Sequence, residues 1–335
     1  MSSSVITVGL DVHKESISAC WIEGAGGVDV EREDSFANRD SDIRRFFHKI
    51  ASRGDLRVCY EAGPCGFVVY RQLASMSIPC DVVAPGLIPK RPGDRIKTDR
   101  RDARNLARLY RGGYLTPIRV PAEAEEAVRD LMRCREDLRG ELTRLRNRVL
   151  KFCLRRGFVW RDGSHWTTKH WQWLRPLKFE PSAAQRTFHE YLDQLDHALD
   201  RLRDLDAEIS RIAKEEPFRD DVARLSCLRG INVLSAMVLL TEIGDIRRFD
   251  SPRALMAFVG LVPSLYASAD RANRGSITKC GNKHVRRILV ESSWHYRHPI
   301  QPAKLLKARC EGQSSIVARE ARDAQRRLGG RYRRM

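Results

Sequence analysis

The chain has 335 residues, of which 42% are hydrophobic and 31% are charged, and 61 Lys and Arg against 43 Asp and Glu give it a formal net charge of +18. This length is enough for two or three domains with substantial cores. No apolar run approaches the roughly 18 residues that span a membrane, and the first residues lack the pattern of a signal peptide, so we expect a cytoplasmic protein rather than a membrane or secreted one.

The distribution of cysteines and of charge narrows the class of protein. The nine cysteines are scattered singly and form no CxxC pair, which argues against a zinc site or a disulfide framework. Residues 274–335 hold sixteen Lys and Arg and four Asp and Glu, a net charge of +12. Such a concentration of positive charge predicts contact with nucleic acid, with a merely solvated basic surface as the alternative.

The first third of the chain has the pattern of a mixed α/β domain. A β-branched apolar run ends at Asp11, as expected for a buried strand, and glycines at 24, 26 and 27 mark a turn. The predicted elements are strands at 5–10, 17–22 and 28–31, a helix at 40–53, a strand at 56–60, a helix at 67–76 and a strand at 80–84. Three strands followed by alternating helix and strand favour a ribonuclease-H-like sheet with a helix layer on each side.

Four acidic residues stand where such a sheet would gather metal ligands. Asp11 and Glu61 each end a predicted strand, and Asp99 and Asp102 share one face at the start of a helix that runs to about Tyr110. Acids at a helix start also serve as caps and favour the helix dipole, which is the alternative role for either aspartate. Magnesium prefers oxygen ligands, so the four acids together predict a divalent-cation site.

The middle of the chain predicts two long amphipathic helices. One apolar stripe runs from Val128 to Phe152, broken only by Arg135, and a second runs from Leu192 to Ile212. Their spacing favours an antiparallel hairpin or a coiled-coil dimer arm. Residues 158–181 between them carry four of the six tryptophans. That segment is either a small hydrophobic cluster capping the hairpin or a set of rings that stack on bases.

The second half contains a glycine turn and a serine-containing loop. Gly230 separates two apolar helical segments, in the manner either of a helix-hairpin-helix or of an ordinary turn. Further on, serines near residues 264–268 precede a run of arginines and lysines. A serine in a basic loop is a possible phosphodiester nucleophile, but composition alone does not separate it from an ordinary loop serine.

Four segments resemble a known family: VGLDVHKE, VCYEAGPCGF, KTDRRDARNLARL and FVGLVPSLYAS…RGSITKCGNKHVRRILVE. They look like the IS-one-ten family of insertion-sequence transposases, bacterial mobile-element recombinases related to the Piv-type DNA invertases. The resemblance covers almost the whole chain. It implies an α/β RuvC-like catalytic domain over 1–118, a helical coiled-coil dimerisation region over 119–215 with the Trp-rich insertion 158–181, and a mainly α C-terminal transposase domain over 216–335.

The resemblance also implies roles for single residues. The four acids of the family, which hold Mg²⁺, fall on Asp11, Glu61, Asp99 and Asp102. The serine nucleophile falls by register on Ser268, although Ala269 and Asp270 follow it where the family usually has glycine. Ser264 and Ser276 are the other candidates for the nucleophile. The cations expected to bind nucleic acid are Arg271, Arg274, Lys279, Lys283, Arg286 and Arg287.

The function implied by the resemblance is that of an RNA-guided DNA transposase, a site-specific recombinase with a phosphoserine intermediate. Its expected partners are donor and target DNA, a guide (bridge) RNA and further copies of the chain, as a homodimer or a tetramer, in the bacterial cytoplasm at the nucleoid. A RuvC-like metal-dependent nuclease or Holliday-junction resolvase, which uses the acids and water only, is the alternative enzyme. A nucleic-acid-binding scaffold with a decayed site is the non-enzymatic alternative.

Overall fold

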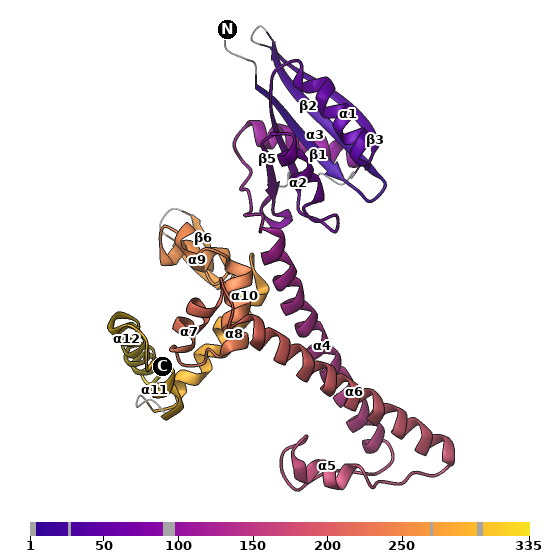
Figure 1. Cartoon of the computed structure of the whole chain (residues 1–335), viewed down its shortest axis with the longest axis vertical. Coiled ribbons are helices and arrows are strands. Elements are labelled where there is room, and N and C mark those ends of the chain that lie inside the picture. Colours follow the sequence, from indigo (N-terminus) through magenta and orange to yellow (C-terminus); the bar gives the residue numbers. More distant parts are fainter. Residues whose placement is uncertain (1–4, 26–27, 90–97, 269–270, 300–303) are drawn as a thin grey trace. The chain divides into compact units, whose positions relative to one another are not determined.

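The computed structural model describes residues 5–25, 28–89, 98–268, 271–299 and 304–335 (Figure 1). At residues 25, 28, 267, 268, 271 and 272 it describes the backbone alone. The chain divides into two compact units, residues 1–120 and 121–335. Within the described ranges, no helix combines the length and the apolar character that crossing a membrane requires.

The first unit is built on a five-stranded sheet. Its strands are β1 (Val5–Val12), β2 (Ser16–Ala25), β3 (Val28–Ala37), β4 (Asp55–Glu61) and β5 (Cys80–Val83), in the order β3-β2-β1-β4-β5. The first three strands form an antiparallel meander, and β4 and β5 continue the sheet in parallel with β1. The predicted strands are confirmed, but β3 extends six residues beyond the prediction, to Ala37. It is a largely exposed edge strand, so its polar residues gave no apolar signal.

Helices cover both faces of this sheet. On one face, α1 (Asp40–Ala51) and α2 (Val68–Ser75) pack against the buried side chains of alternate strand residues such as Val8 and Val58. On the other face, α3 (Asp99–Arg111) lies directly over β1 at Gly9, where an added Cβ would collide with the backbone of Ala103 and Ala107. Glycine is required here because the helix backbone touches the strand backbone.

Three ion pairs hold α3 onto β3. Arg104 pairs with Glu33 at 2.5 Å, Arg108 with Glu31 at 2.6 Å, and Arg111 with Asp29. The three arginines are spaced four and three residues apart, so they line one face of the helix. Exposed ion pairs contribute little stability each, but three in a row fix the rotation of α3 about its own axis.

In the second unit, two long helices form an antiparallel pair. These are α4 (Glu123–Leu154) and α6 (Ser182–Ile212), and their apolar stripes form one buried cluster. Arg135 pairs with Asp206, and Arg148 donates a hydrogen bond to Gln194 at 3.4 Å. The later residue of α4 thus contacts the earlier residue of α6, so the two helices run in opposite directions. The single charged break in the first stripe is thus an ion pair across the hairpin.

The Trp-rich segment packs at the end of this hairpin. It contains α5 (Thr168–Leu174), whose His170 is fully buried among Trp160, Trp166 and Trp173. The four tryptophans of the segment are half-buried, and Trp166, Trp171 and Trp173 pack against the cluster between α4 and α6. The rings therefore form a small aromatic core that closes the hairpin.

The rest of the second unit is mainly helical. Its helices are α7 (Arg219–Ser226), α8 (Val233–Ile243), α9 (Pro252–Phe258), α10 (Lys283–Trp294), α11 (Lys304–Cys310) and α12 (Ser315–Tyr332). Between α9 and α10 lies a two-stranded antiparallel ribbon of β6 (Pro263–Ser268) and β7 (Arg271–Ile277). Met132 of α4 and Ile209 of α6 join the core around α8, so both long helices are anchored in this body.

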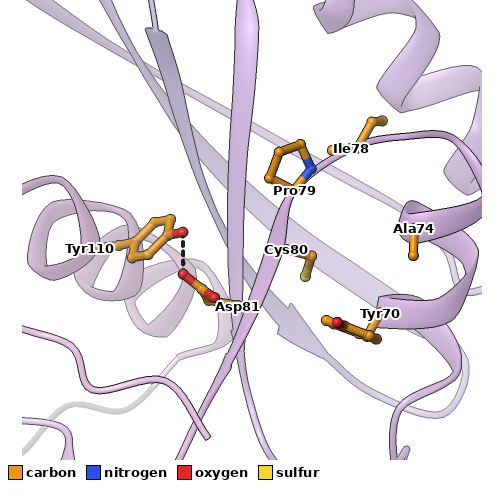
Figure 2. A pocket seen from close by; sticks show the side chains of 7 residues that line it. All are labelled: Tyr70, Ala74, Ile78, Pro79, Cys80, Asp81 and Tyr110. Atoms are coloured by element: carbon orange, nitrogen blue, oxygen red, sulfur yellow. Dashed lines mark hydrogen bonds between the residues drawn. The ribbon is translucent and has the colours of Figure 1, made fainter. Parts of the chain in front are cut away.

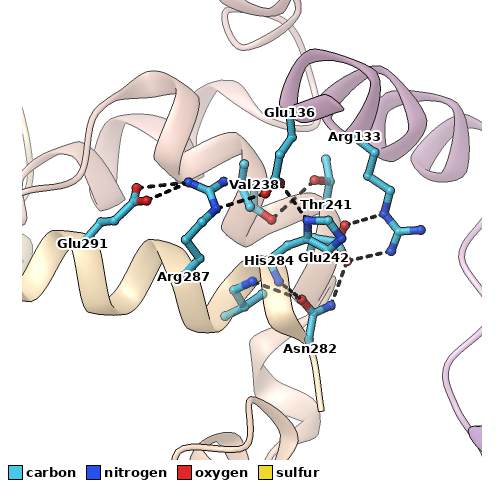
Figure 3. Close-up of polar contacts among 10 residues, drawn as sticks. Arg133, Glu136, Val238, Thr241, Glu242, Asn282, His284, Arg287 and Glu291 are labelled. Atoms are coloured by element: carbon cyan, nitrogen blue, oxygen red, sulfur yellow. Dashed lines mark hydrogen bonds and ion pairs between the residues drawn. The ribbon is translucent and has the colours of Figure 1, made fainter. Parts of the chain in front are cut away.

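A network of ion pairs and hydrogen bonds fixes α4 to α8 and α10 (Figure 3). Arg133 binds both carboxylate oxygens of Glu242, whose side chain is only 2% exposed, and the Asn282 amide donates to the same carboxylate at 2.7 Å. Glu136 accepts from His284 and Arg287. The pKa of Glu242 is below its ordinary value: burial alone would raise it, but the hydrogen bonds from Arg133 and Asn282 outweigh that effect. The charged form is thus the stable one.

Candidate functional site

Two of the predicted acids stand at the carboxyl ends of neighbouring parallel strands. Leu10 of β1 lies opposite Tyr60 of β4, and Asp11 and Glu61 are the next residues along each strand. Leu10 and Tyr60 both face the core beneath α1 and α2. Because side chains alternate along a strand, Asp11 and Glu61 belong to the opposite face, which α3 covers.

The other two predicted acids begin α3. Asp99 is its first residue and Asp102 lies in its first turn, while the preceding Thr98 caps the helix by accepting a hydrogen bond from the Arg101 amide at 3.4 Å. The close approach at Gly9 and the three arginine pairs to β3 set the position of this helix start. The sheet and α3 thereby bring acids distant in sequence to one edge.

The ligand atoms of Asp11, His13 and Asp99 lie within 4.8 Å of one another. His13 Nε2 is 3.2 Å from Asp11 Oδ2 and 3.5 Å from Asp99 Oδ1. The Asp11 side chain is 19% exposed, whereas His13 and Asp99 are open to solvent. Glu61 is exposed on the adjacent strand end, and neither it nor Asp102 belongs to this group of three.

Burial and neighbouring charges both act on the Asp11 carboxyl. Burial raises the pKa of its carboxyl above the ordinary value, His13 opposes that shift, and the negative charges of Asp102 and Asp99 add to it. Asp102 is therefore close enough to Asp11 to interact electrostatically, although it lies outside the group of three. Carboxylates gathered in this way repel one another, and a cation among them would relieve the repulsion.

His13 is the residue of this cluster that sequence reasoning did not assign. It lies two residues after Asp11 in the segment VGLDVHKE, beyond the end of β1. Its only signal in the sequence was an imidazole close to a predicted acidic ligand. Imidazole is a common metal ligand for softer ions, whereas carboxylates suit Mg²⁺ and Mn²⁺.

A pocket in the same unit lies away from the acids. It has a volume of about 260 Å³ and is lined by residues near the start of β5, among them Cys80, Asp81, Tyr70 and Tyr110 (Figure 2). Tyr110 donates a hydrogen bond to Asp81 at 2.6 Å. Burial raises the pKa of the Cys80 thiol to about 12, so it stays protonated at neutral pH. The acids stand at the other end of the parallel strands, so this pocket is separate from their site.

The predicted nucleophile lies in the second unit, on the ribbon. Ser268 is the last residue of β6 and pairs with Arg271 of β7; its side chain, like residues 269 and 270, lies outside what the structure describes. The Ser264 hydroxyl donates to the Ser276 carbonyl at 3.3 Å, so it is engaged within the ribbon. The acids and Ser268 thus belong to different units.

The predicted nucleic-acid-binding cations have different surroundings. Arg274, Lys279 and Lys283 are exposed. Arg286 donates to the Val259 carbonyl at 2.7 Å, and Arg287 binds the carboxylates of Glu136 and Glu291 (Figure 3). Those two guanidinium groups hold α10 in place. For Arg271 the structure gives only a strand position.

A cleft beside the Gly230 turn adds further positive charge to this unit. Gly230 has a φ of +84° between α7 and α8, which favours glycine. The cleft has a volume of about 580 Å³, and its polar lining includes Arg229, Arg309, His295 and His298. Arg309 donates to the Ile231 carbonyl at 3.1 Å, which holds one of these side chains at the turn.

Two family profiles match the chain. The DEDD profile of IS110 transposases, described as "Transposase", matches residues 8–158, which include the four acids. The profile "Transposase IS116/IS110/IS902 family" matches residues 222–305, which include the ribbon.

Individual relatives align over nearly the full length. The putative transposase y4qE of Sinorhizobium fredii is 38% identical over 327 residues, which cover 97% of this chain and 80% of the relative. The transposase for insertion sequence element IS1533 of Leptospira borgpetersenii is 34% identical over 332 residues, 98% of this chain and 96% of the relative. The transposase for insertion sequence element IS1111A of Coxiella burnetii is 24% identical over 295 residues, which cover 85% of this chain and 76% of the relative. The chain therefore belongs to the IS110 (IS-one-ten) family of insertion-sequence transposases, enzymes that act on DNA.

Proposed function

We propose that this transposase cleaves and rejoins DNA through a covalent serine intermediate, with a divalent cation held by the acids of the first unit. The observation that carries the proposal is the grouping of Asp11, His13 and Asp99 at the end of the central strand, with Asp102 near enough to interact electrostatically with Asp11. The order β3-β2-β1-β4-β5, with a helix layer on each face, supports a ribonuclease-H-like, RuvC-like domain.

The residues of the cluster fit a hard divalent cation. Asp11, Asp99, Asp102 and Glu61 offer carboxylate oxygens, the ligand type that Mg²⁺ prefers. Burial raises the pKa of Asp11, and the negative charges of Asp102 and Asp99 add to that shift; a cation at the site would offset their repulsion. His13 adds an imidazole nitrogen, which Mn²⁺ accepts more readily than Mg²⁺ does. A bound cation would polarise the scissile phosphate and stabilise its developing charge. The carboxylates of this chain would hold and orient that cation.

The covalent step is assigned to Ser268. Its Oγ forms a bond to the phosphorus while the bond from phosphorus to one deoxyribose oxygen breaks, and the serine proton is given up as the leaving oxygen gains one. In rejoining, a hydroxyl of the partner strand attacks the phosphoserine and releases Ser268. The exposed cations Arg274, Lys279 and Lys283 would hold the flanking phosphates.

The proposed reaction also requires an assembly. The acids and Ser268 stand on different units of the chain, so the proposed reaction uses a group from each unit. Strand exchange joins two duplexes, and we infer a dimer, assembled further into a tetramer, with α4 and α6 as the dimerisation arms. Within this scheme a guide RNA selects the donor and target sequences by base pairing, and the basic residues 274–335 contact the backbone.

The nucleophile is tested with an intact element on a plasmid in a bacterial host. Excision is measured by amplifying the excision junction, and covalent intermediates are measured as complexes of protein and DNA that resist detergent. We expect Ser268→Ala to abolish both signals. Asp11→Ala should abolish excision, while Ser276→Ala on the same ribbon should retain both signals.

Three results would count against this assignment. Excision by Ser268→Ala at the wild-type level would favour the alternative, a metal-dependent nuclease or junction resolvase that uses water. Loss of the covalent complex in Ser264→Ala or Ser276→Ala but not in Ser268→Ala would move the nucleophile. Excision by Asp11→Ala would refute the metal site. Sequencing of RNA that copurifies with the wild-type chain tests the guide, because a transcript of the element's flank is expected.

A further inference from the structure

We propose that Tyr266 stacks on an unpaired base of the DNA strand next to the phosphate that is cleaved, and so positions that strand on the β6–β7 ribbon. This inference rests on the proposed function, because it takes Ser268 as the residue that meets the phosphate. It adds a positioning residue to that site and states the chemistry that the residue recognises.

The ribbon exposes two large side chains to solvent. Tyr266 is 76% exposed and Leu265 is 61% exposed, although they are neighbours in a strand and point to opposite faces. Neither belongs to a buried cluster of the described chain. A ribbon of two strands is marginally stable in water unless something covers it. Large apolar side chains on such a ribbon therefore indicate a surface that is covered in the working complex.

The register of the ribbon places Tyr266 next to the proposed nucleophile. Residues i and i+2 of a strand share a face and lie roughly 7 Å apart, so position 266 is the nearest described position to 268 on the same face of the same strand. Across the ribbon, Tyr266 pairs with Asn273 and Ser268 pairs with Arg271. A serine, an arginine, a tyrosine and an asparagine thus occupy adjacent register positions of one small sheet.

Charge identifies the kind of partner. Residues 263–290 contain one acid, Asp270, against six Lys and Arg. In the described part of the chain, no carboxylate forms an ion pair with Arg274, Lys279 or Lys283. A protein partner would need a strongly acidic surface with an aromatic-binding pocket. A DNA strand supplies both complements, since its phosphates meet the cations and every base has a flat face for the phenol ring.

The base of the ribbon is tied to the body of the second unit. Ser264 is bonded to the Ser276 carbonyl, and Pro263 pairs with Ile277 beside a bulge. Beyond the ribbon, Asn282 caps α10 and binds the buried Glu242. Tyr266 therefore projects from a strand whose root is fixed to the body of the unit.

The test uses the full chain and an oligodeoxynucleotide of about 20 thymidines, longer than the roughly 4–16 nucleotides that one single-strand-binding fold covers. Replacing single thymidines with 5-iododeoxyuridine allows ultraviolet crosslinking to a stacked aromatic ring, and mass spectrometry locates the crosslinked peptide. We expect the main crosslink at Tyr266. Binding measured by fluorescence anisotropy should weaken about 5- to 150-fold in Tyr266→Leu.

The matched variants separate stacking from charge and from folding. Tyr266→Phe keeps the ring and should retain both the crosslink and the affinity. Tyr114→Leu, which removes another tyrosine that is 69% exposed, should behave as the wild type. Tyr266→Leu should leave the dependence of affinity on salt unchanged, because it removes no charge. Arg274→Gln should make the slope of log affinity against log salt concentration shallower, by the amount expected for about one lost phosphate contact.

Several outcomes would overturn the proposal. One is a crosslink found only elsewhere in the chain, and another is wild-type affinity in Tyr266→Leu. A third is an effect confined to oligouridylate, which would assign the ring to RNA, and a fourth is a change only in self-association measured by light scattering. The nucleophile is judged separately, since Ser268→Ala should still crosslink through Tyr266. A crosslink at Tyr266 to the oligothymidylate, together with no detergent-resistant complex of wild-type protein and DNA in the plasmid assay, would leave the stacking intact and refute the serine step.

Discussion

The acids stand at the ends of central strands that helices cover on both faces, whereas Ser268 ends a ribbon two strands wide with exposed side chains on each face. The first arrangement positions Asp11 and Asp99 before any substrate binds. The second leaves Leu265 and Tyr266, which precede Ser268 on the same strand, exposed in the described structure. The difference suggests that the metal half of the proposed centre is preorganised, and that DNA completes the serine half.

The largest effect is expected at Gly9, because the position of the acids depends on the absence of a Cβ atom at this residue. Gly9→Ala puts a methyl group into the backbone of Ala103 and Ala107, so α3 must shift away from β1. We expect the first unit to lose about 1–3 kcal/mol of stability or more, and excision to fall sharply as Asp99 and Asp102 move. Hydrogen exchange measured by mass spectrometry should rise in β1 and α3 and stay unchanged in α4 and α6.

The control for that change is Gly86→Ala. An added Cβ at Gly86 meets no atom within 4 Å, so the variant should exchange and excise like the wild type. Wild-type exchange in Gly9→Ala would mean that the contact between strand and helix does not fix the acids. The acid site would then not be preorganised by this contact, and its proposed difference from the serine site would be refuted.

A smaller effect is expected in the network that fixes α4 to α8 and α10. Glu242→Gln removes the charge that Arg133 and Asn282 bind, and because Arg133 is partly open to water the cost should be about 1–3 kcal/mol. The measurement is urea unfolding of the second unit, followed by the exchange of α8 and α10. Glu291→Gln, an exposed carboxylate that pairs with Arg287, is the matched control and should change stability by less than about 0.5 kcal/mol.

The cost of Glu242→Gln should also depend on pH. The folded state lowers the pKa of Glu242, so its ionised form stabilises the fold at any pH above its unfolded pKa of about 4.3. That contribution is lost as the pH falls through the folded pKa. The difference between wild type and Glu242→Gln should therefore shrink towards zero as the pH drops below about 4.3. A difference that stays constant over this range would mean that the charge is not what Arg133 and Asn282 stabilise.

The smallest effect is expected within the ribbon itself. Ser264→Ala removes the hydroxyl that donates to the Ser276 carbonyl, an exposed hydrogen bond with a net value of about 0.5–1.5 kcal/mol at most. Because the ribbon opens locally, global unfolding should hardly change, while exchange of the β7 amides should rise. Unchanged exchange would show that other contacts hold the two strands together. The strand that carries Ser268 would then be more ordered without DNA than we infer.

Much of the first unit was predictable because its residues repeat a simple pattern. The strands at 5–10 and 56–60 read as mainly apolar runs, interrupted only by Thr7 and Arg57, and Asp11 and Glu61 are the next residues after them. The extent of β3 was not predictable, since an exposed edge strand has no apolar face. The role of Arg135 was also hidden, because its partner Asp206 lies 71 residues away.

For the candidate site, too, some features depend on local sequence and others on tertiary contacts. Sequence by itself determined the family, the acids, the basic C-terminal region and the two long helices, because these depend on residue type and local spacing. Tertiary structure decided that His13 joins Asp11 and Asp99, that Arg287 binds Glu136 and Glu291, and that Tyr266 is left uncovered. Such facts depend on which distant elements meet. A side chain's partners and its exposure are set by the packing of the whole fold rather than by its neighbours along the chain.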